Sequence, residues 1–462
     1  MANPIRKLFG TDGVRGEAGR FPLDAATLRT VGISLAVHLQ ETLGRRPSIV
    51  VGRDTRESGE CLEQALIEGA IEAGAECKSA GVITTPGVAF LARSLPADAG
   101  VVISASHNPY QDNGFKIFAP SGRKLDDDTE RLIEADILTG AAAGNAAHSQ
   151  ARSDTIPPPV VDLAPALRAR YLDFLEHEIG DGLSLNHQTM VIDAANGAAS
   201  KLAPELFTRL GAHVIAINHE PDGRNINRDC GSLHIETLQR KVVAAGADIG
   251  VAFDGDADRA LFVDAQGRYV DGDASLWILA NYMKARNKLS NGLVVATVMS
   301  NIGLEIALRS LELRLLRTDV GDKYVLEELI RSEASLGGEQ SGHIIFPRLS
   351  LAGDGMITTI CLLRAMSDEG KPLHALTEGF RRYPQVLVNV QVREKRPFEE
   401  VEQIHSLVRE TESKLGAGGR LLLRYSGTEP LARVMIEGDD QNTIEGYAKD
   451  LASVIRQTLG AG

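Results

Sequence analysis

The stretch Asp248-Ile249-Gly250-Val251-Ala252-Phe253-Asp254-Gly255-Asp256-Ala257-Asp258-Arg259 joins an apolar strand to a charged loop. The same order occurs twice more, in Gly100–Ser104 followed by Ala105-Ser106-His107-Asn108-Pro109, and in Gly337-Gly338 followed by Glu339-Gln340-Ser341-Gly342-His343. Each copy also opens with an apolar strand, at Ser48–Gly52, Met190–Asp193 and Gly292–Thr297. The chain therefore contains a threefold repeat of one strand-and-helix pattern.

Strands that alternate with helices predict parallel sheets covered on both faces. In such sheets ligands bind beyond the carboxyl ends of the strands, so the three polar loops are expected to converge on one cleft. The spacing of apolar residues in 24–43 predicts a helix capped by Asp24 and ended by Gly44, and Ser58 is expected to cap the next one. Residues 140–159 are predicted to be a linker, and a separate α+β domain is expected after Arg382.

Length and composition limit the class of protein. A chain of 462 residues predicts about three or four domains. The net charge of −13 argues against a nucleic-acid partner, and a phosphate ligand would need locally concentrated basic residues. No apolar run approaches the roughly 18 residues of a membrane helix, the start lacks a secretory signal, and the four cysteines are scattered. A cytoplasmic protein without a membrane partner is expected.

The loop with Asp254, Asp256 and Asp258 is the strongest metal candidate. In an extended segment alternate residues point the same way, so the three carboxylates would converge. Oxygen ligands suit Mg²⁺ or Ca²⁺ rather than zinc. An EF-hand would need Gly and Glu where Arg259 and Ala265 stand. A solvated acidic turn is the alternative, and the preceding apolar strand argues against it.

Ser106 follows the strand of the first copy and has two functional interpretations. A serine hydrolase would require the G-x-S-x-G elbow, which is absent. A phosphorylated serine would bring about −1.5 to −2 charge, and a cation held by the three aspartates could accept its oxygens. An ordinary turn serine is the plain alternative.

Two further loops offer ligand-binding groups. Glu339 and its neutral neighbours suit the hydroxyls of a sugar, although a capped glycine turn explains them equally well. The segment Arg424-Tyr425-Ser426-Gly427-Thr428-Glu429-Pro430, with Arg433 beyond it, combines backbone donors and guanidinium groups that suit a phosphate. A plain β-turn is the alternative there. No P-loop, HExxH or GxGxxG motif is present in the appropriate context.

Together the four loops resemble the α-D-phosphohexomutases. Ser104–Pro109, Asp254–Arg259, Gly338–His343 and Arg424–Pro430 match motifs of that family in order, and Phe9-Gly10-Thr11-Asp12-Gly13-Val14-Arg15-Gly16 is similar to the start of its glucosamine branch. The resemblance spans nearly the whole chain. It implies α/β domains with mixed, mainly parallel sheets at 1–158, 159–262 and 263–380, an α+β domain at 381–462, and a central cleft among the four.

The resemblance also implies a role for each candidate residue. Ser106 would carry a covalent phosphate and would bind one Mg²⁺ together with Asp254, Asp256 and Asp258. Arg15 and Lys116 would lie near the transferred group. Glu339 and Ser341 would contact the sugar. The remaining phosphate would be bound by the C-terminal loop residues Arg424, Ser426, Gly427, Thr428 and Arg433.

The implied reaction interconverts glucosamine 6-phosphate and glucosamine 1-phosphate through a hexosamine 1,6-bisphosphate, for amino-sugar nucleotide and cell-wall precursor synthesis. His107 and Lys116 are the candidates for the general base. A phosphomannomutase/phosphoglucomutase with the same mechanism is one alternative, and an inactive sugar-phosphate-binding protein is another. The oligomeric state is left open, a homodimer included.

Overall fold

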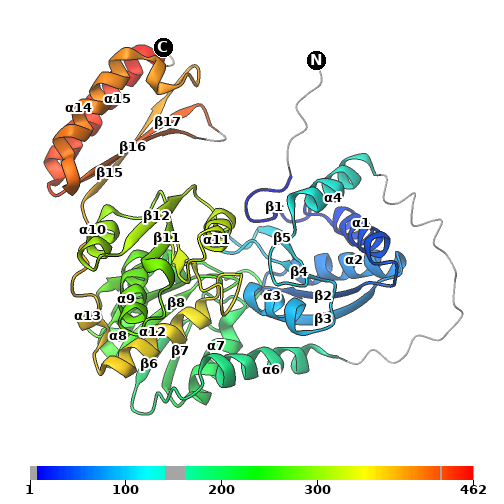
Figure 1. Cartoon of the computed structure of the whole chain (residues 1–462). Coiled ribbons are helices and arrows are strands. Elements are labelled where there is room, and N and C mark those ends of the chain that lie inside the picture. Colours follow the sequence, from blue (N-terminus) through cyan, green and yellow to red (C-terminus); the bar gives the residue numbers. More distant parts are fainter. Residues whose placement is uncertain (1–7, 141–161, 427–428, 461–462) are drawn as a thin grey trace, which may run out of the picture. The chain divides into compact units, whose positions relative to one another are not determined.

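The computed structural model describes residues 8–140, 162–426 and 429–460, and they form two compact units. Unit 1 combines the chain up to Val298 with Leu316–Glu378, and unit 2 combines Met299–Leu315 with the chain from Gly379 onward. Within the described residues, three mixed α/β sheets follow one another and an antiparallel sheet with helices comes last (Figure 1). This order confirms the predicted fold class. The predicted linker lies outside the described residues except for Gly140.

The first repeat is built on a sheet whose strands run in the order β1-β5-β4-β2-β3. These are β1 (Val14–Glu17), β5 (Asp112–Phe118), β4 (Ala99–Ile103), β2 (Ser48–Arg53) and β3 (Glu76–Val82). Strand β2 is parallel to β3 and β4, whereas β5 is antiparallel to β4 and β1. Helices α1 (Ala25–Leu43), α2 (Gly59–Glu72) and α4 (Asp127–Thr139) pack on one face, and α3 (Thr85–Ser94) packs on the other.

The second repeat has the same arrangement, in the order β10-β9-β8-β6-β7. Its strands are β6 (Thr189–Asp193), β7 (His213–Ile217), β8 (Ile249–Phe253), β9 (Ala260–Asp264) and β10 (Tyr269–Val270). Its helices are α6 (Ala164–Phe174), α7 (Ala199–Arg209) and α8 (Glu236–Ala245). Again β6 is parallel to β7 and β8, and β9 is antiparallel to β8 and β10. The threefold repeat inferred from the sequence thus reflects a repeated sheet topology.

The third repeat is a shorter version, with the order β12-β11-β13-β14. Its strands are β11 (Leu293–Thr297), β12 (Arg314–Thr318), β13 (Gly337–Gly338) and β14 (Ile344–Ile345). The surrounding helices are α9 (Gly272–Ala285), α10 (Ile302–Ser310), α11 (Asp322–Arg331), α12 (Gly355–Glu369) and α13 (Leu373–Leu376). Strand β13 is parallel to β11 and antiparallel to β14.

Each of the three polar loops connects a strand with a parallel neighbour to a strand that returns antiparallel. Residues 104–111 connect β4 to β5, residues 254–259 connect β8 to β9, and residues 339–343 connect β13 to β14. The sheets are mixed, as predicted. However, among the described strands of the first two sheets antiparallel pairings are as frequent as parallel ones, because the chain folds back after each loop. The sequence pattern alone had suggested mainly parallel sheets.

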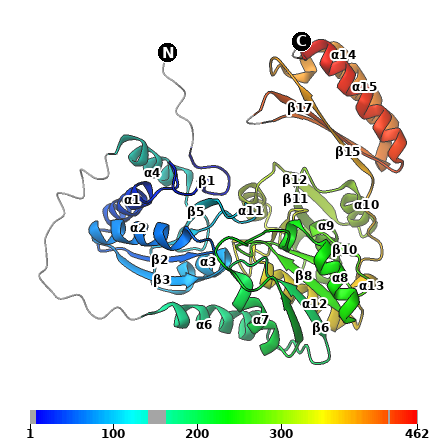
Figure 2. The ribbon, with the colours of Figure 1, turned by 180° about the vertical axis from the view of Figure 1, so that it is seen from behind.

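The C-terminal sheet of unit 2 is antiparallel in the order β15-β17-β16. It contains β15 (Gln385–Gln391), β16 (Arg420–Tyr425) and β17 (Leu431–Glu437), with α14 (Glu402–Leu415) and α15 (Gln441–Leu459) packed on it (Figure 2). Helix α14 begins at Glu402, because Val401 is extended and separates it from a short 3-10 turn at Phe398–Glu400. Among the described residues, no helix combines the length and apolar character needed to cross a membrane.

Two predicted helix caps in the first repeat have different outcomes. Asp24 accepts a hydrogen bond from the Thr27 backbone N–H at 2.9 Å, and Gly44 ends α1 with φ 64°, so both predicted signals of α1 are confirmed. Ser58 precedes α2 but makes no side-chain cap bond. Its Oγ instead accepts a hydrogen bond from Asn113 Nδ2 at 2.8 Å, which ties α2 to the start of β5.

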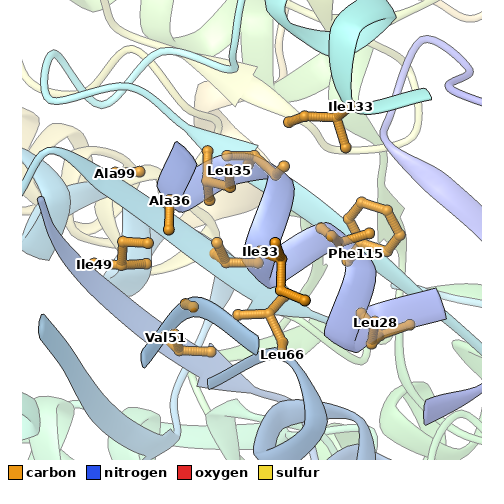
Figure 3. Packing of buried hydrophobic residues seen from close by; sticks show 14 of the residues in the cluster. Leu28, Ile33, Leu35, Ala36, Ile49, Val51, Leu66, Ala99, Phe115 and Ile133 are labelled. Carbon is orange, nitrogen blue, oxygen red and sulfur yellow. The ribbon is translucent and has the colours of Figure 1, made fainter. Parts of the chain in front are cut away.

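The core of the first repeat lies between its sheet and α1 and α2. Figure 3 shows α1 side chains, among them Ile33, Leu35 and Ala36, near Ile49 and Val51 of β2. At the crossing of the two helices, a Cβ on Gly32 would lie 2.0 Å from the Leu66 carbonyl oxygen, and one on Gly69 would lie 2.1 Å from that of Arg29. The two helix backbones therefore touch, and a side chain at either glycine would force them apart.

We predict that Gly69→Ala destabilises unit 1 by about 1–3 kcal/mol, because the added methyl group overlaps the rigid backbone of α1. Thermal unfolding followed by circular dichroism measures the loss. The control is Gly446→Ala, the same change inside α15, where the Cβ would meet nothing within 4 Å. It should leave stability unchanged or raise it by about 0.5–1 kcal/mol. Equal midpoints for Gly69→Ala and the unsubstituted protein would contradict the close helix crossing.

Candidate functional site

Ser106 lies at the carboxyl end of β4 and is completely buried. Its backbone φ is 51°, which is uncommon for a residue other than glycine. The Ser106 Oγ donates a hydrogen bond to Asp254 Oδ2 at 2.6 Å, across 148 residues of sequence. The structure therefore brings the candidate phosphate carrier and the candidate metal loop into direct contact.

The conformation of the serine loop is held by a buried guanidinium group that the sequence analysis did not identify. Arg56 donates to the carbonyl oxygens of Ser106 at 2.9 Å and Asn108 at 2.8 Å, and its Nε pairs with Asp54 at 2.9 Å. Asn227 of the second repeat donates to the same two carbonyls, at 2.9 and 3.0 Å. The hydrogen bonds from Arg56 and Asn227 to these two carbonyls keep the loop in the conformation that gives Ser106 its positive φ. Arg56 could have been suspected from the sequence, because it belongs to the polar residues that directly follow β2.

The three aspartates converge on a turn rather than on an extended segment. The Ala257 N–H donates to the Asp254 carbonyl at 3.1 Å, and Ala257 has φ 56°. The sequence analysis assumed an extended segment, and that prediction of the backbone was wrong. The three carboxylates nevertheless converge, as expected. Ligand oxygens of Asp254, Asp256 and Asp258 all lie within 4.8 Å of one another, and all three residues are buried.

The surroundings of these carboxylates fit a hard divalent cation. In the described part of the chain, Asp256 Oδ1 and Asp258 Oδ1 are buried and accept no hydrogen bond. Burial, together with Asp258 and Asp256, raises the pKa of Asp254 well above its usual value, which reflects an excess of negative charge. Oxygen ligands without partners in such a place suit Mg²⁺ or Ca²⁺.

A second acidic group among the described residues lacks these features. Asp173, Glu176 and His177 lie within ligand distance of one another, but none of them is buried. Arg209 already pairs with Asp173 and with Glu176, each at 3.2 Å. The buried loop is the better metal site of the two.

Two cations predicted from the sequence lie beside the carboxylates. Lys116 on β5 is buried, with Nζ 3.0 Å from Asp256 Oδ2. Burial lowers the pKa of Lys116, but Asp12 and Asp256 overcome that effect and hold it well above its usual value, so the side chain stays an ammonium. Arg15 on β1 donates to Asn108 Oδ1 at 3.2 Å and pairs with Asp12. Both cations can stabilise negative charge near Ser106.

His107 is the neighbour of Ser106 in space as well as in sequence, with Nδ1 3.3 Å from the serine Oγ. Burial, reinforced by Arg259 and Arg15, lowers the pKa of His107 to about 4. The imidazole is therefore uncharged at neutral pH, unlike Lys116.

The third loop contacts the aspartate loop through the Gly342 backbone and through His343, which lies 3.6 Å from Asp258. Glu339 accepts hydrogen bonds from the Gly321 N–H at 3.2 Å and from Ser341 Oγ at 3.3 Å. The Gly342 carbonyl accepts a bond from the Ala260 N–H at 3.1 Å, directly after the aspartate loop. Both predicted sugar-binding residues therefore lie on a loop anchored to the aspartate loop.

Six ionisable side chains from the three repeats form a closed ring of alternating charge, in the order Asp12, Lys116, Asp258, His343, Asp322 and Lys124. Lys116 Nζ lies 3.1 Å from Asp12 and 3.3 Å from Asp258. His343 lies 3.6 Å from Asp258 and 3.8 Å from Asp322. Lys124 closes the ring at 2.6 Å from Asp322 and 2.5 Å from Asp12. Although burial opposes its charge, Asp258 raises the pKa of His343 to about 9, which makes it the third cation.

The sequence analysis missed Lys124 and Asp322 because neither belongs to a recognisable motif. Asp12 and His343 stand within quoted motifs, but the alternation of charge depends on contacts between different repeats. The ring lines part of a cavity of about 430 Å³ between the first and third repeats.

The predicted phosphate loop belongs to unit 2. Arg424 on β16 stands directly opposite Arg433 on β17. Ser426 Oγ lies 3.4 Å from Arg433 Nη2, and its carbonyl accepts a hydrogen bond from Lys395 at 2.6 Å. Like charges opposite each other on a sheet repel unless an anion lies between them. Gly427 and Thr428, which were also predicted to bind the phosphate, lie outside the described residues.

Comparison with known proteins identifies all four parts of the chain. The alpha/beta/alpha domains I, II and III of the phosphoglucomutase/phosphomannomutase family match residues 6–143, 169–267 and 271–383, and the C-terminal domain of that family matches residues 387–454.

Individual relatives cover almost the whole chain. A phosphoglucosamine mutase of Solibacter usitatus is 48% identical over 98% of this chain and 99% of its own. A solved phosphoglucomutase/phosphomannomutase family protein of Burkholderia thailandensis has a TM-score of 0.78 and 25% identity, over 98% of this chain and 97% of the other. The fold of N-acetylphosphoglucosamine mutase of Aspergillus fumigatus, solved with GlcNAc-6P and magnesium, gives a TM-score of 0.62 at 18% identity, over 99% and 97% of the two chains.

The four domain matches, the 48% identity to a full-length relative and the contact between the serine and aspartate loops agree with one another. The chain belongs to the phosphoglucosamine mutases, within the phosphoglucomutase/phosphomannomutase family of phosphohexomutases.

Proposed function

We propose that Ser106 carries the phosphoryl group of a mutase reaction that interconverts glucosamine 6-phosphate and glucosamine 1-phosphate. The observation that carries the proposal is the 2.6 Å contact between Ser106 Oγ and Asp254 in a buried group of three aspartates. A phosphate on Ser106 would lie against those carboxylates only with a cation to balance the charge. A resident Mg²⁺ is proposed, bound by Asp254, Asp256, Asp258 and the Ser106 phosphate, and it would neutralise charge on the transferring group.

In the first half-reaction, the bond between phosphorus and Ser106 Oγ breaks and a bond to the sugar O1 forms. The proton of the sugar hydroxyl leaves, and Ser106 Oγ gains one. Lys116 and Arg15 are proposed to stabilise charge on the transferring oxygens. The product of this step is a hexosamine 1,6-bisphosphate.

His107 and Lys116 both stay candidates for proton transfer, since the pKa of about 4 leaves His107 uncharged but makes it a weak base. A base must be uncharged before it accepts a proton, and the pKa of Lys116 is held well above its usual value by the surrounding carboxylates. His107 is uncharged and lies 3.3 Å from Ser106 Oγ.

The second half-reaction requires the bisphosphate to turn over, so that its 6-phosphate returns to Ser106. After the turn, the two phosphates have exchanged places. One anchoring loop can therefore serve both orientations. We assign this role to Arg424, Ser426, Gly427, Thr428 and Arg433 of unit 2. Two arginines stand opposite each other there and Glu429, 3.3 Å from Arg433, balances only one charge, which supports an anion at this place. Glu339 and Ser341 are proposed to bind sugar hydroxyls.

Glucosamine is favoured as the sugar because the relatives at 44–48% identity are phosphoglucosamine mutases. The GlcNAc-6P complex of the Aspergillus fumigatus protein points to the same class of ligand. The proposed location is the cytoplasm, and the proposed domain limits remain 1–158, 159–262, 263–380 and 381–462.

Ser106→Ala should reduce mutase turnover to background, because no other group can hold the phosphoryl between half-reactions. Intact mass spectrometry should also show that the covalent phosphate is gone. Ser367→Ala, at an exposed serine of α12, is the control and should keep both. Full turnover by Ser106→Ala would rule out the carrier role.

Arg424→Ala should raise KM for glucosamine 6-phosphate by about ten- to a hundredfold, since one charge-assisted contact contributes about 1.5–3 kcal/mol. Divalent-cation affinity should not change. Arg409→Ala, at an exposed arginine of α14, is the matched control and should leave KM alone. An unchanged KM in Arg424→Ala would show that the anchoring phosphate binds elsewhere.

A side-by-side assay of glucosamine, glucose and mannose 6-phosphates tests the sugar assignment. We expect the highest kcat/KM for glucosamine 6-phosphate. A preference for glucose or mannose would favour the phosphoglucomutase/phosphomannomutase alternative with the same phosphoserine chemistry.

A further inference from the structure

The two carboxylate oxygens of Asp256 have opposite surroundings. Oδ2 accepts a hydrogen bond from Thr85 Oγ1 at 2.6 Å and one from Lys116 Nζ at 3.0 Å. Oδ1 is buried and, among the described residues, accepts none. One oxygen is thus fully engaged by the protein, and the other is left for a ligand.

Thr85 reaches Asp256 from a different repeat and is itself rigidly placed. It is buried in the first turn of α3, where Thr84 Oγ1 accepts a hydrogen bond from the Gly87 N–H at 3.1 Å. The Thr85 backbone N–H also donates to the Asp256 carbonyl oxygen, at 3.0 Å. A residue bonded through both its backbone and its side chain holds Asp256 at two points. In the sequence, Thr84-Thr85-Pro86-Gly87 indicates only the start of a helix.

Lys116 alone would not fix the direction of the Asp256 carboxylate. Its ammonium group is shared with Asp258 at 3.3 Å and Asp12 at 3.1 Å, and an ammonium attracts an oxygen from many directions. Rotation of a carboxylate about its terminal bond is soft. The short, directional bond from the threonine hydroxyl is therefore the contact that selects which Asp256 oxygen stays free of hydrogen bonds from the described residues.

We propose that Thr85 is a positioning residue for the divalent-cation site, because it holds Asp256 through Oδ2 and leaves the buried Oδ1 without a hydrogen bond from the described residues. The proposal rests on the metal site of the proposed function. The first repeat then contacts all three carboxylates, since Ser106 bonds Asp254, Thr85 bonds Asp256 and Lys116 bonds Asp258. Partners behind metal ligands of this kind commonly change affinity about 10–100-fold when removed.

The test is the affinity of the full-length, dephosphorylated and EDTA-treated protein for Mn²⁺, measured by electron paramagnetic resonance of the free ion. Thr85→Val keeps the shape and the backbone bond but removes the hydroxyl, and it should weaken Mn²⁺ binding about tenfold or more. Thr85→Ser keeps the hydroxyl and should bind Mn²⁺ within about threefold of the unsubstituted protein. Circular dichroism checks that each variant is folded, and Thr85→Ala replaces the valine variant if that one does not fold.

The matched control is Thr27→Val, which removes another threonine-to-carboxylate bond, Thr27 Oγ1 to Asp24 Oδ2 at 3.0 Å, far from the loop in sequence. It should leave Mn²⁺ affinity unchanged. If folded Thr85→Val binds Mn²⁺ as well as the unsubstituted protein, or if Thr85→Ser or Thr27→Val loses as much affinity, the positioning role is overturned while the mutase assignment stands. No Mn²⁺ binding by the unsubstituted protein would instead remove the proposed metal site itself.

Discussion

Three carboxylates buried on one tight turn are the constraint on which the rest of the site depends. Asp254, Asp256 and Asp258 cannot all stay ionised in a buried place unless positive charge surrounds them. Lys116 and His343 supply part of that charge, from the first and third repeats. Two carboxylate oxygens still lack a hydrogen bond among the described residues, so the protein leaves room for a cation. Side chains of three repeats meet at this point because the negative charge of the buried carboxylates must be balanced.

The repeated fold-back of the chain makes this convergence possible. After β4, β8 and β13 the chain turns through a polar loop and returns antiparallel. The returning strand can then present its own side chain at the same end of the sheet, as β5 presents Lys116 beside the Ser106 loop. The sharp turns require φ 51° at Ser106 and φ 56° at Ala257, and hydrogen bonds from Arg56 and Asn227 offset that strain at the serine loop.

The proposed reacting serine and the proposed metal ligands are kept in place by other side chains. Arg56 holds the carbonyls of the serine loop, Thr85 holds Asp256, and Lys124 joins Asp12 to Asp322. Each of these contacts crosses between loops or between repeats. In unit 2 two arginines stand opposite each other, and Glu429, 3.3 Å from Arg433, balances only part of their positive charge. Such a pair is suited to binding a phosphate that arrives and leaves.

The sequence by itself determined the repeat, the helix of residues 25–43, the strands that precede the first two loops, and the candidate site residues, from Ser106 to Arg424. These follow from local periodicity, from capping and from motifs, all of which are properties of neighbouring residues. Only the tertiary structure decided that the aspartates converge through a turn, that the strands after the loops run antiparallel, and that Asp12, Lys124 and Asp322 complete a ring of charge. The physical reason is that buried charges choose partners by distance in space, and Thr85 and Asp256 stand 171 residues apart in the chain.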